Sequence, residues 1–208
     1  MAVYVIVAIL AYAIGSINFS VLISKKIAGF DVREKGSGNA GTTNVLRTVG
    51  KLPALLTLIC DILKGVVAIG IALLFAWITG NKDVALLVQI AGILVIIGHT
   101  FPIFFGFKGG KGIATSLGVL LMTNWQIGII CLVFALVLMA LTRMVSVGSV
   151  AAAVLFPVLT LFIGDSHFIV QGNYFFYSLM IACIVIFNHR SNIKRILDGT
   201  ENKLNFKK

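Results

Sequence analysis

Apolar segments recur along the whole 208-residue chain with short polar breaks between them, and this pattern constrains the fold more than any other feature. Hydrophobic residues make up 59% of the sequence and charged residues 12%, too few to cover a water-soluble surface. A helix needs about 20 apolar residues to cross the hydrocarbon core of a bilayer. The sequence therefore predicts an all-α, polytopic membrane protein with a single integral-membrane domain over residues 1–208. The predicted spans are 2–24, 53–79, 84–105, 113–122, 126–141, 147–163 and 173–188.

The number of spans depends on residues 113–141, which form either one long helix or two helices joined at Thr123 and Asn124. With two helices, only Lys82 falls on one side of the membrane and Lys64 lies inside a span, so the other fifteen of the 17 basic residues share one face. One fused helix would divide the basic residues between both faces. Because lysines and arginines concentrate in cytoplasmic loops, the pattern predicts seven transmembrane helices, with the N-terminus outside and the C-terminus cytoplasmic.

Polar residues concentrate in three segments that this topology places on the cytoplasmic face. The first, 35–47, combines glycines with hydroxyl and amide side chains and ends in an arginine. Glycines let a ligand approach backbone amides, hydroxyls and amides supply neutral hydrogen bonds, and a guanidinium binds phosphate through paired hydrogen bonds. An ordinary turn does not need so many polar side chains in succession. The candidate ligands are Ser37, Asn39, Thr43, Asn44 and Arg47.

The second segment, 98–115, contains a glycine-rich turn directly before the short fourth span. Irregular backbone and lysines are costly in lipid unless they line a protein-enclosed or wet site, and glycine-rich turns and helix N-termini bind anions. The nucleotide P-loop requires Ser or Thr after its lysine, whereas Gly112 follows Lys111 here, which argues against a nucleoside triphosphatase. His99 fits a structural role at a helix end better than a ligand role. The candidate ligands are Lys108, Gly109, Gly110, Lys111 and Gly112.

The third segment, 189–203, follows the last span. Attraction to anionic lipid would explain its lysines and arginines. It would not explain His189, Asn192 and Glu201, which are therefore candidate site residues, together with Ser146 at the start of the sixth span. A further polar pair, Asp61 and Lys64, lies on one helical face inside the second span, and it fits a structural ion pair and a site role equally well.

The three segments together resemble the bacterial integral-membrane family of glycerol-3-phosphate acyltransferases that use acyl phosphate as donor. The resemblance covers nearly the whole chain and depends on three motifs in the right order. They are Ser37-Gly-Asn-x-Gly-x-Thr43-Asn44 with Arg47, Gly98-His99 through Phe107-Lys-Gly-Gly-Lys-Gly112, and His189-x-x-Asn192 with Arg195, Gly199, Glu201 and Lys203. One mild departure is Thr42, where many relatives carry alanine.

The resemblance implies an enzyme that transfers the acyl group of a long-chain acyl phosphate to the 1-hydroxyl of sn-glycerol 3-phosphate. The products are 1-acyl-sn-glycerol 3-phosphate (lysophosphatidic acid) and phosphate, and the reaction begins phospholipid synthesis. The implied location is the bacterial cytoplasmic (inner) membrane, with the active site on the cytoplasmic side. The implied partners are both substrates and membrane lipid. No cofactor, metal ion or nucleic acid is expected, because no motif for a metal, a nucleotide, coenzyme A or a carrier protein is evident.

With the family in view, the residues divide into two groups. Lys108–Gly112, with Thr43 and Asn44, is assigned to the acyl-phosphate group. Glycerol 3-phosphate is assigned to Ser37, Arg47, Lys108, Ser146, His189 and Asn192. Of these, His189, Asn192, Ser37 and Lys108 are the expected catalytic residues. The attacking hydroxyl needs a proton acceptor. His189 is one candidate, because an ordinary imidazole titrates near neutral pH. The leaving phosphate of the acyl phosphate is the other.

The main alternative is a transporter or channel for an organic phosphate, because glycine-interrupted helices with positive ends facing an anion are also how transporters bind substrates. Such proteins usually carry an internal repeat and polar groups on both faces, and neither is evident here. A membrane scaffold would give no reason for three glycine and hydroxyl clusters on one face. The enzyme is therefore the favoured hypothesis.

Overall fold

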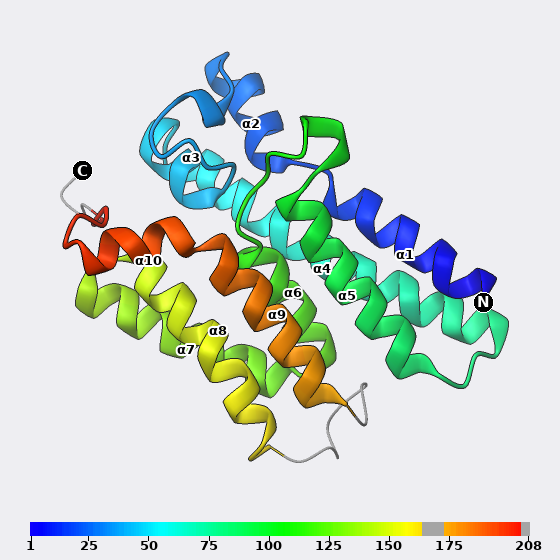
Figure 1. The fold of residues 1–208 in the computed structure, drawn as a ribbon. Coiled ribbons are helices and arrows are strands. Elements are labelled where there is room, and N and C mark those ends of the chain that lie inside the picture. Colours follow the sequence, from blue (N-terminus) through cyan, green and yellow to red (C-terminus); the bar gives the residue numbers. More distant parts are fainter. Residues whose placement is uncertain (164–172, 205–208) are drawn as a thin grey trace. The chain divides into compact units, whose positions relative to one another are not determined.

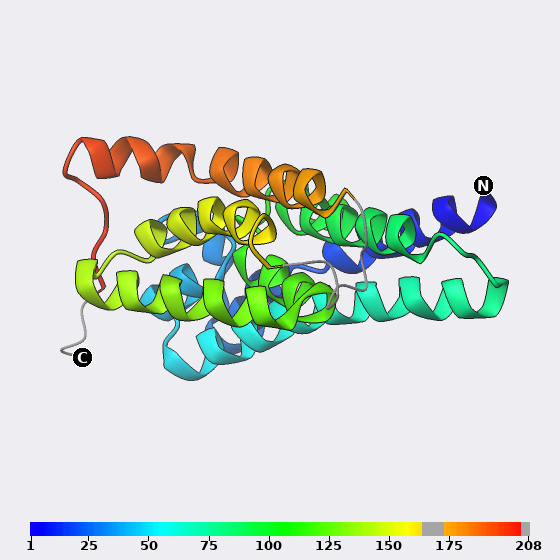
Figure 2. The same ribbon diagram turned by 90° about the horizontal axis from the view of Figure 1, so that it is seen from below.

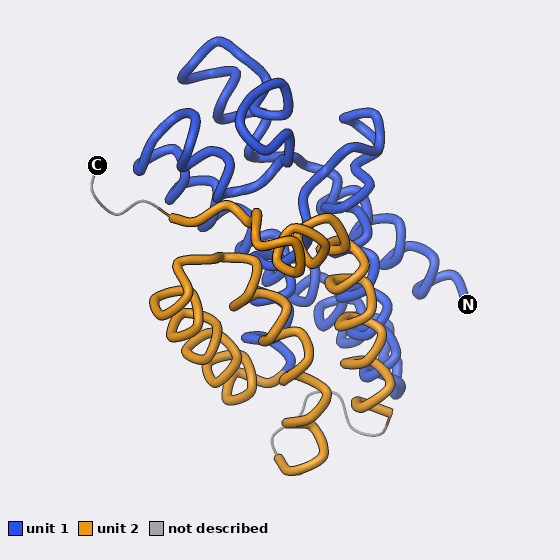
Figure 3. The backbone as a smooth tube through the Cα atoms, turned by 60° about the vertical axis from the view of Figure 1, so that its left-hand side comes forward, with its two compact units in different colours: residues 1–123 blue, residues 124–208 orange. Residues whose placement is uncertain are grey.

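The structure is a computed structural model that describes residues 1–163 and 173–204. It contains two compact units, Met1–Thr123 and Asn124–Lys208, which Figure 3 distinguishes by colour. No strand occurs among the described residues, which confirms the all-α prediction. The predicted outer loop at 164–172 lies outside the described residues, as do Lys207 and Lys208 of the predicted basic tail.

The longer helices of the first unit pack side by side (Figure 1). Helix α1 (Ala2–Gly15) lies against α5 (Val84–Thr100), while α4 (Lys51–Thr79) contacts both of these helices and also α6 (Ile113–Thr123). Two shorter helices, α2 (Phe19–Ala28) and α3 (Thr42–Thr48), pack on α4. The polar loops of this unit also contain the 3₁₀ turns η1 (Val32–Glu34) and η2 (Ile103–Phe105).

The second unit begins with α7 (Trp125–Thr142) and continues through α8 (Val145–Thr160) and α9 (Tyr174–Asn188). Helix α8 packs against both of its neighbours. The short helix α10 (Arg190–Leu197) follows α9 after the single residue His189, and its red and orange ribbon is visible in Figure 2. The described part of this unit ends in an extended tail whose Leu204 amide donates a hydrogen bond to the Arg143 carbonyl, with N and O 2.7 Å apart.

The predicted helices from the second span onward agree with α4 to α9 to within a few residues, with one exception. Helix α5 ends at Thr100, although the prediction continued to residue 105, because Pro102 disfavours helical geometry at Phe101. The predicted turn at Thr123 and Asn124 is confirmed. The Asn124 side chain accepts a hydrogen bond from the Ile127 amide at 2.9 Å and so begins α7.

The first predicted span contains a break that the apolar pattern did not reveal. Helix α1 ends at Gly15, and the Asn18 side chain begins α2 by accepting a hydrogen bond from the Val21 amide at 3.3 Å. The break is stabilised from α4, where the Lys64 ammonium donates to the carbonyls of Gly15 and Ile17 at 3.2 and 3.1 Å. A buried cation thus satisfies the carbonyls that the end of α1 leaves without helical partners.

Four helical stretches are long and apolar enough to cross a membrane: Ala2–Ala28, Lys51–Thr79, Val84–Phe105 and Trp125–Thr142. Helices α6, α8 and α9 are apolar but shorter, with 11, 16 and 15 residues. Large apolar side chains along the long helices are exposed, as expected for surfaces that face lipid. The seven-span count and the orientation of the two termini stay predictions.

Helix α6 crosses α4 at a pair of glycines. A methyl group on Gly65 would lie 2.5 Å from the Thr115 carbonyl oxygen, and one on Gly118 would overlap the Ile62 carbonyl. Such small residues let helix backbones approach closely, which is how apolar helices gain packing energy in a membrane, where lipid is as apolar as they are. Gly70, also in α4, has no heavy atom within 4 Å of the corresponding position.

We therefore expect Gly118→Ala to destabilise the protein by about 1–3 kcal/mol, because the added methyl group forces α6 away from α4. Gly70→Ala is the matched control, and it should be neutral or slightly stabilising because alanine is the better helix former. Unfolding of both variants in detergent, followed by helical circular dichroism, measures the difference. Equal midpoints for the two variants would contradict the close approach of α4 and α6.

Candidate active site

The first polar segment is organised around the buried side chain of Asn44, near the start of α3. Its Oδ1 accepts a hydrogen bond from the Ser37 amide at 2.9 Å. Its Nδ2 lies 2.8 to 3.0 Å from the carbonyls of Val32, Lys35 and Asn39. One amide side chain therefore holds both ends of the loop. Gly36 lies in the left-handed region (φ 61°) directly against Asn44, so no larger residue fits there.

This arrangement leaves the other candidates of the first segment at or near the surface. The Ser37 side chain is exposed, and so is that of Arg47 on α3. Asn39 and Thr43 are half-buried. The segment thus presents hydroxyl, amide and guanidinium groups from α3 and from a loop whose backbone is held from inside, as a preformed ligand site requires.

The glycine-rich turn of the second segment packs on the end of α5. The amides of Gly109 and Gly110 donate hydrogen bonds to the carbonyls of Thr100 and His99, at 3.0 and 3.1 Å. These two amides are therefore occupied within the fold, while the Lys108 side chain is exposed. After Lys111, Gly112 adopts a left-handed conformation (φ 87°) that only glycine adopts readily, and α6 begins at the next residue.

The first turn of α6 places two hydroxyls near the free end of the helix. Thr115 and Ser116 are buried, and within the described residues neither hydroxyl has a hydrogen-bond partner. Buried polar groups without a protein partner are uncommon and require an explanation such as a ligand or ordered water. Their position after Gly112 agrees with the anion-binding role expected of this turn.

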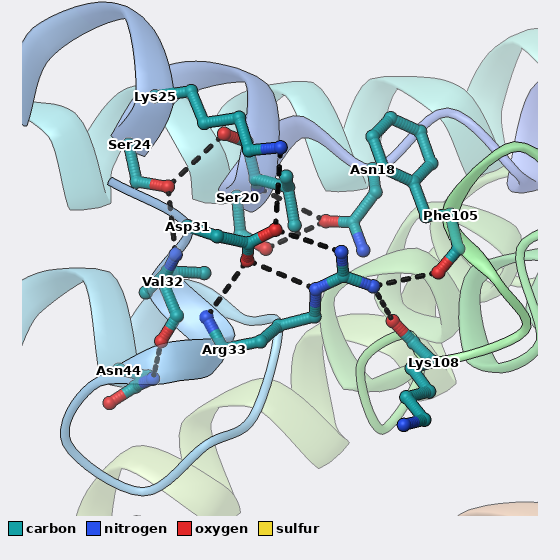
Figure 4. A network of polar contacts seen from close by, with 11 residues as sticks. Asn18, Ser20, Ser24, Lys25, Asp31, Val32, Arg33, Asn44, Phe105 and Lys108 are labelled. Carbon is teal, nitrogen blue, oxygen red and sulfur yellow. Dashed lines mark hydrogen bonds and ion pairs between the residues drawn. The ribbon is translucent and has the colours of Figure 1, made fainter. Parts of the chain in front are cut away.

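Arg33, which lies just before the first polar segment, connects this part of the chain to the second polar segment (Figure 4). The Arg33 guanidinium donates through Nη1 to the carbonyls of Phe105 and Lys108, at 2.7 and 3.1 Å. On its other side, Nε and Nη2 donate to the carboxylate of Asp31, at 3.0 and 2.8 Å. The Arg33 hydrogen bonds lower the pKa of Asp31 to about 2 against the opposing effect of burial, so this carboxylate is ionised at neutral pH.

A cavity of about 550 Å³ opens beside this network. Its lining includes Gly38 from the first polar segment and Lys108 and Gly109 from the second. Asp31, Arg33, Glu34, Phe105 and Gly106 complete the lining. Residues that are about 70 positions apart in the sequence therefore border one cavity.

The buried pair inside the second span has the contacts of a structural ion pair. Lys64 Nζ lies 2.9 Å from Asp61 Oδ1, and the same oxygen is 3.5 Å from Nδ1 of His99. Lys64 also binds the carbonyls at the end of α1, while the His99 ring abuts Gly110. Of the two interpretations open from the sequence, these contacts support the structural one.

In the second unit, Glu201 joins three of the polar residues of α8 and α10. Its Oε1 accepts hydrogen bonds from Ser146 Oγ at 3.0 Å and from Asn192 Nδ2 at 2.8 Å. Its Oε2 accepts from Nε of Arg195 at 2.8 Å. Burial raises the pKa of Glu201, but these hydrogen bonds and the arginine charge outweigh burial and lower the pKa overall. Glu201 is therefore an anion that holds the tail onto the helices.

His189, between α9 and α10, is buried, and its Nδ1 lies 2.8 Å from the Val185 carbonyl oxygen. A carbonyl only accepts hydrogen bonds, so Nδ1 carries the proton. In the neutral ring, Nε2 is then the basic nitrogen. This tautomer is the one that a histidine base acting through Nε2 requires.

Comparison with known proteins assigns the family. The profile of the family described as glycerol-3-phosphate acyltransferase matches residues 5–199. The chain belongs to this family. The glycerol-3-phosphate acyltransferase of Clostridioides difficile (strain 630) is 42% identical over 205 residues, which cover 99% of this chain and 97% of that relative. The glycerol-3-phosphate acyltransferase of Thermoanaerobacter sp. (strain X514) is 44% identical over 200 residues, 96% of this chain and 95% of that relative.

Two solved structures show the same fold. Both are crystal structures of PlsY (YgiH), an integral membrane glycerol 3-phosphate acyltransferase, one in a glycerol 3-phosphate form and one in a lysophosphatidic acid form. The first is 34% identical with a TM-score of 0.84, covering 97% of this chain and 96% of that chain. The second is 32% identical with a TM-score of 0.82, covering 97% and 95%. These comparisons confirm the predicted family. They also confirm that the protein is an acyltransferase of phospholipid synthesis, which follows from the family.

Within this family member, the structure brings together some of the predicted residues and adds others. Asn44 joins Ser37 to Asn39 in the first unit, and Glu201 joins Ser146 to Asn192 in the second. Sequence analysis missed Asp31 and Arg33. The signal in the sequence is an acid and an arginine two residues apart, just before the glycine-rich loop. The catalytic and binding roles of the individual residues stay predictions.

We expect Glu201→Gln to loosen the tail, because the amide cannot accept all three hydrogen bonds. A hydrogen bond to a charged group is worth about 1.5–3 kcal/mol, so hydrogen exchange of the Thr200 and Leu204 amides should be about tenfold faster or more. Because the pKa of Glu201 is lowered, the stability that its ionised carboxylate contributes is fully present above the ordinary carboxyl pKa of about 4.3. This stability is lost as the pH falls through the lowered pKa of Glu201.

Asp198→Asn is the control for this substitution, because Asp198 is an exposed acid of the same tail. The two variants should differ clearly at pH 7, and the gap between Glu201→Gln and the unsubstituted protein should narrow at strongly acidic pH. Equal exchange in Glu201→Gln and Asp198→Asn at pH 7 would show that Glu201 does not hold the tail.

Proposed function

We propose that this protein transfers the acyl group of a long-chain acyl phosphate to the 1-hydroxyl of sn-glycerol 3-phosphate. The observation that carries the proposal is the cavity of the first unit, where Gly38 of one glycine-rich segment and Lys108 of the other form parts of one lining. Both proposed substrates carry phosphate, and both segments supply the glycines and cations that bind phosphate. The neighbouring crystal structures of PlsY, in glycerol 3-phosphate and lysophosphatidic acid forms, support the acceptor and the product.

The acyl-phosphate group is assigned to the Lys108–Gly112 turn, with Thr43 and Asn44. The start of α6 supports this assignment through Gly112 and the two hydroxyls that follow it. In the structure Asn44 already holds the loop, so its contribution to binding would come through the backbone it positions. Glycerol 3-phosphate is assigned to Ser37, Arg47, Lys108, Ser146, His189 and Asn192.

In the proposed reaction, the 1-hydroxyl oxygen bonds to the acyl carbon, and the bond between that carbon and the bridging oxygen breaks, so that inorganic phosphate leaves. His189 takes the hydroxyl proton at Nε2, and the Val185 carbonyl that holds Nδ1 keeps the ring in the required tautomer. Lys108 stabilises the negative charge of the phosphates. The alternative acceptor for the proton is the leaving phosphate, with positioning and charge stabilisation then supplying most of the catalysis.

We further propose that the chain is a seven-span protein of the bacterial inner membrane, with its polar segments on the cytoplasmic side. The separate helices α6 and α7 support this count, because they replace the single fused helix of the six-span alternative. The concentration of basic residues on one face supports the orientation.

The direct test supplies the purified protein in lipid with palmitoyl phosphate, with and without glycerol 3-phosphate, and follows phosphate release and product lipid in parallel. We expect phosphate release to depend on glycerol 3-phosphate and to equal lysophosphatidic acid formation, without added metal or coenzyme A. Movement of glycerol 3-phosphate across the liposome membrane without turnover would instead identify the protein as a transporter.

His189→Ala tests the proton acceptor. If His189 is the base, kcat should fall by about 10²–10⁴-fold at saturating substrates while the protein stays folded. Steady-state kinetics, together with a thermal unfolding curve, make this measurement. Turnover close to that of the unsubstituted enzyme would exclude the histidine as base and would favour the leaving phosphate.

A further inference from the structure

The side chain of Arg33 is held on both of its edges by other parts of the first unit. An arginine side chain has five N–H groups. Four of them donate hydrogen bonds here, two to the Asp31 carboxylate and one each to the carbonyls of Phe105 and Lys108. Asp31 itself is only 7% exposed and also accepts a hydrogen bond from the Arg33 amide at 3.0 Å. The guanidinium is therefore a fixed part of the fold with little donor capacity left for a ligand.

Arg33 binds the carbonyls of Phe105 and Lys108, and the chain reverses its direction between these two residues. Between them, Gly106 and Phe107 are both left-handed, with φ of 66° and 58°. This conformation is unfavourable for a phenylalanine, so the reversal needs support from outside the loop. Arg33 supplies that support by binding the carbonyl before the reversal and the carbonyl after it.

The second of these carbonyls belongs to Lys108. Figure 4 shows the Lys108 carbonyl directed at the guanidinium, while its side chain extends away from it. The backbone of Lys108 is thus held by the Asp31–Arg33 pair, and its exposed ammonium is presented by that backbone.

We propose that Arg33 is a positioning residue. Asp31 holds the Arg33 guanidinium, which fixes the backbone of residues 105–108 so that the Lys108 ammonium can contact the substrate phosphate. It does this without binding phosphate itself. The inference rests on the proposed function, because it assigns Lys108 to the substrates. Two properties support it: the Asp31 carboxylate neutralises the Arg33 charge, and the planar fork of arginine matches two carbonyls and a carboxylate at once in a way that lysine cannot.

The test compares Arg33→Lys, Arg33→Gln and Asp31→Asn with the control Lys25→Ala in the acyl-phosphate assay. Lys25 is an exposed partner of the same carboxylate, 3.6 Å from Asp31 Oδ2, so its removal changes the local charge without touching the loop. We expect kcat to fall by about 10²-fold in Arg33→Lys and Arg33→Gln alike, the loss typical of a misplaced catalytic group, because neither side chain can bridge the two carbonyls. Asp31→Asn should lose activity in the same direction, and Lys25→Ala should not change it.

A second readout separates loosening of the loop from unfolding. Hydrogen exchange of the amides that close the turn, Phe107 to the Pro102 carbonyl and Gly109 to the Thr100 carbonyl, should accelerate in the Arg33 and Asp31 variants. Exchange in α4 and α5 should not change. If one Arg33 variant fails to fold, the Asp31→Asn variant carries the same test.

Different results would overturn the inference. If Arg33 binds phosphate directly, Arg33→Lys should keep most of the activity, Arg33→Gln should mainly raise KM, and Asp31→Asn should lower KM by releasing the guanidinium. Full activity in every Arg33 variant would also reject it. If instead the unsubstituted enzyme shows no acyl transfer, the proposed function fails, and the exchange measurement alone decides whether Arg33 holds the loop.

Discussion

Backbone that leaves a helix inside an apolar chain must find its hydrogen-bond partners within the protein, and this constraint shapes the polar parts of this structure. Lys64 satisfies the carbonyls at the break between α1 and α2. Asn44 does the same for the loop that follows η1, and Arg33 for the reversal after η2. Lys64 and Arg33 reach segments that are far away in the sequence, whereas Asn44 closes the loop next to it. In each case the irregular backbone is held by hydrogen bonds within the protein.

This arrangement separates the residues that hold the loops from those that we assign to a ligand. Asn44 and the carboxylates of Asp31 and Glu201 are buried and engaged with protein partners. Ser37, Arg47 and Lys108 are exposed on the segments thus held. Preorganised cations and dipoles are the largest contribution to many acyl transfers, because they need no rearrangement as charge develops. The proposed mechanism therefore depends on the buried residues as much as on the exposed ones.

Most helices could be predicted from sequence, because the length of an apolar run gives the length of the helix. The start of α7 could be predicted as well, because Asn124 caps it through an amide only three residues away. The break at 16–18 was not evident from the apolar pattern, because Lys64, which stabilises it, is nearly fifty residues away along the chain. For the same reason the two backbone partners of Arg33, the carbonyls of Phe105 and Lys108, could not be predicted, because they lie more than seventy residues further on. Asn44 stays a predicted ligand, and the structure adds hydrogen bonds from its side chain to the backbone of Ser37, Val32, Lys35 and Asn39. The family motifs point to these segments, and the roles of the individual residues within them stay predictions.

In the proposed mechanism, the substrate hydroxyl attacks the acyl carbon of an acyl phosphate. Palmitoyl phosphate labelled with ¹⁸O in the bridging oxygen tests it most directly, when it is turned over with glycerol 3-phosphate and the phosphate is analysed by mass spectrometry. Cleavage between carbon and oxygen sends the label into the released phosphate, one label for each lysophosphatidic acid formed, and this is the result we expect. Label found in palmitate, with unlabelled phosphate or with phosphate transferred to the acceptor, would contradict this mechanism.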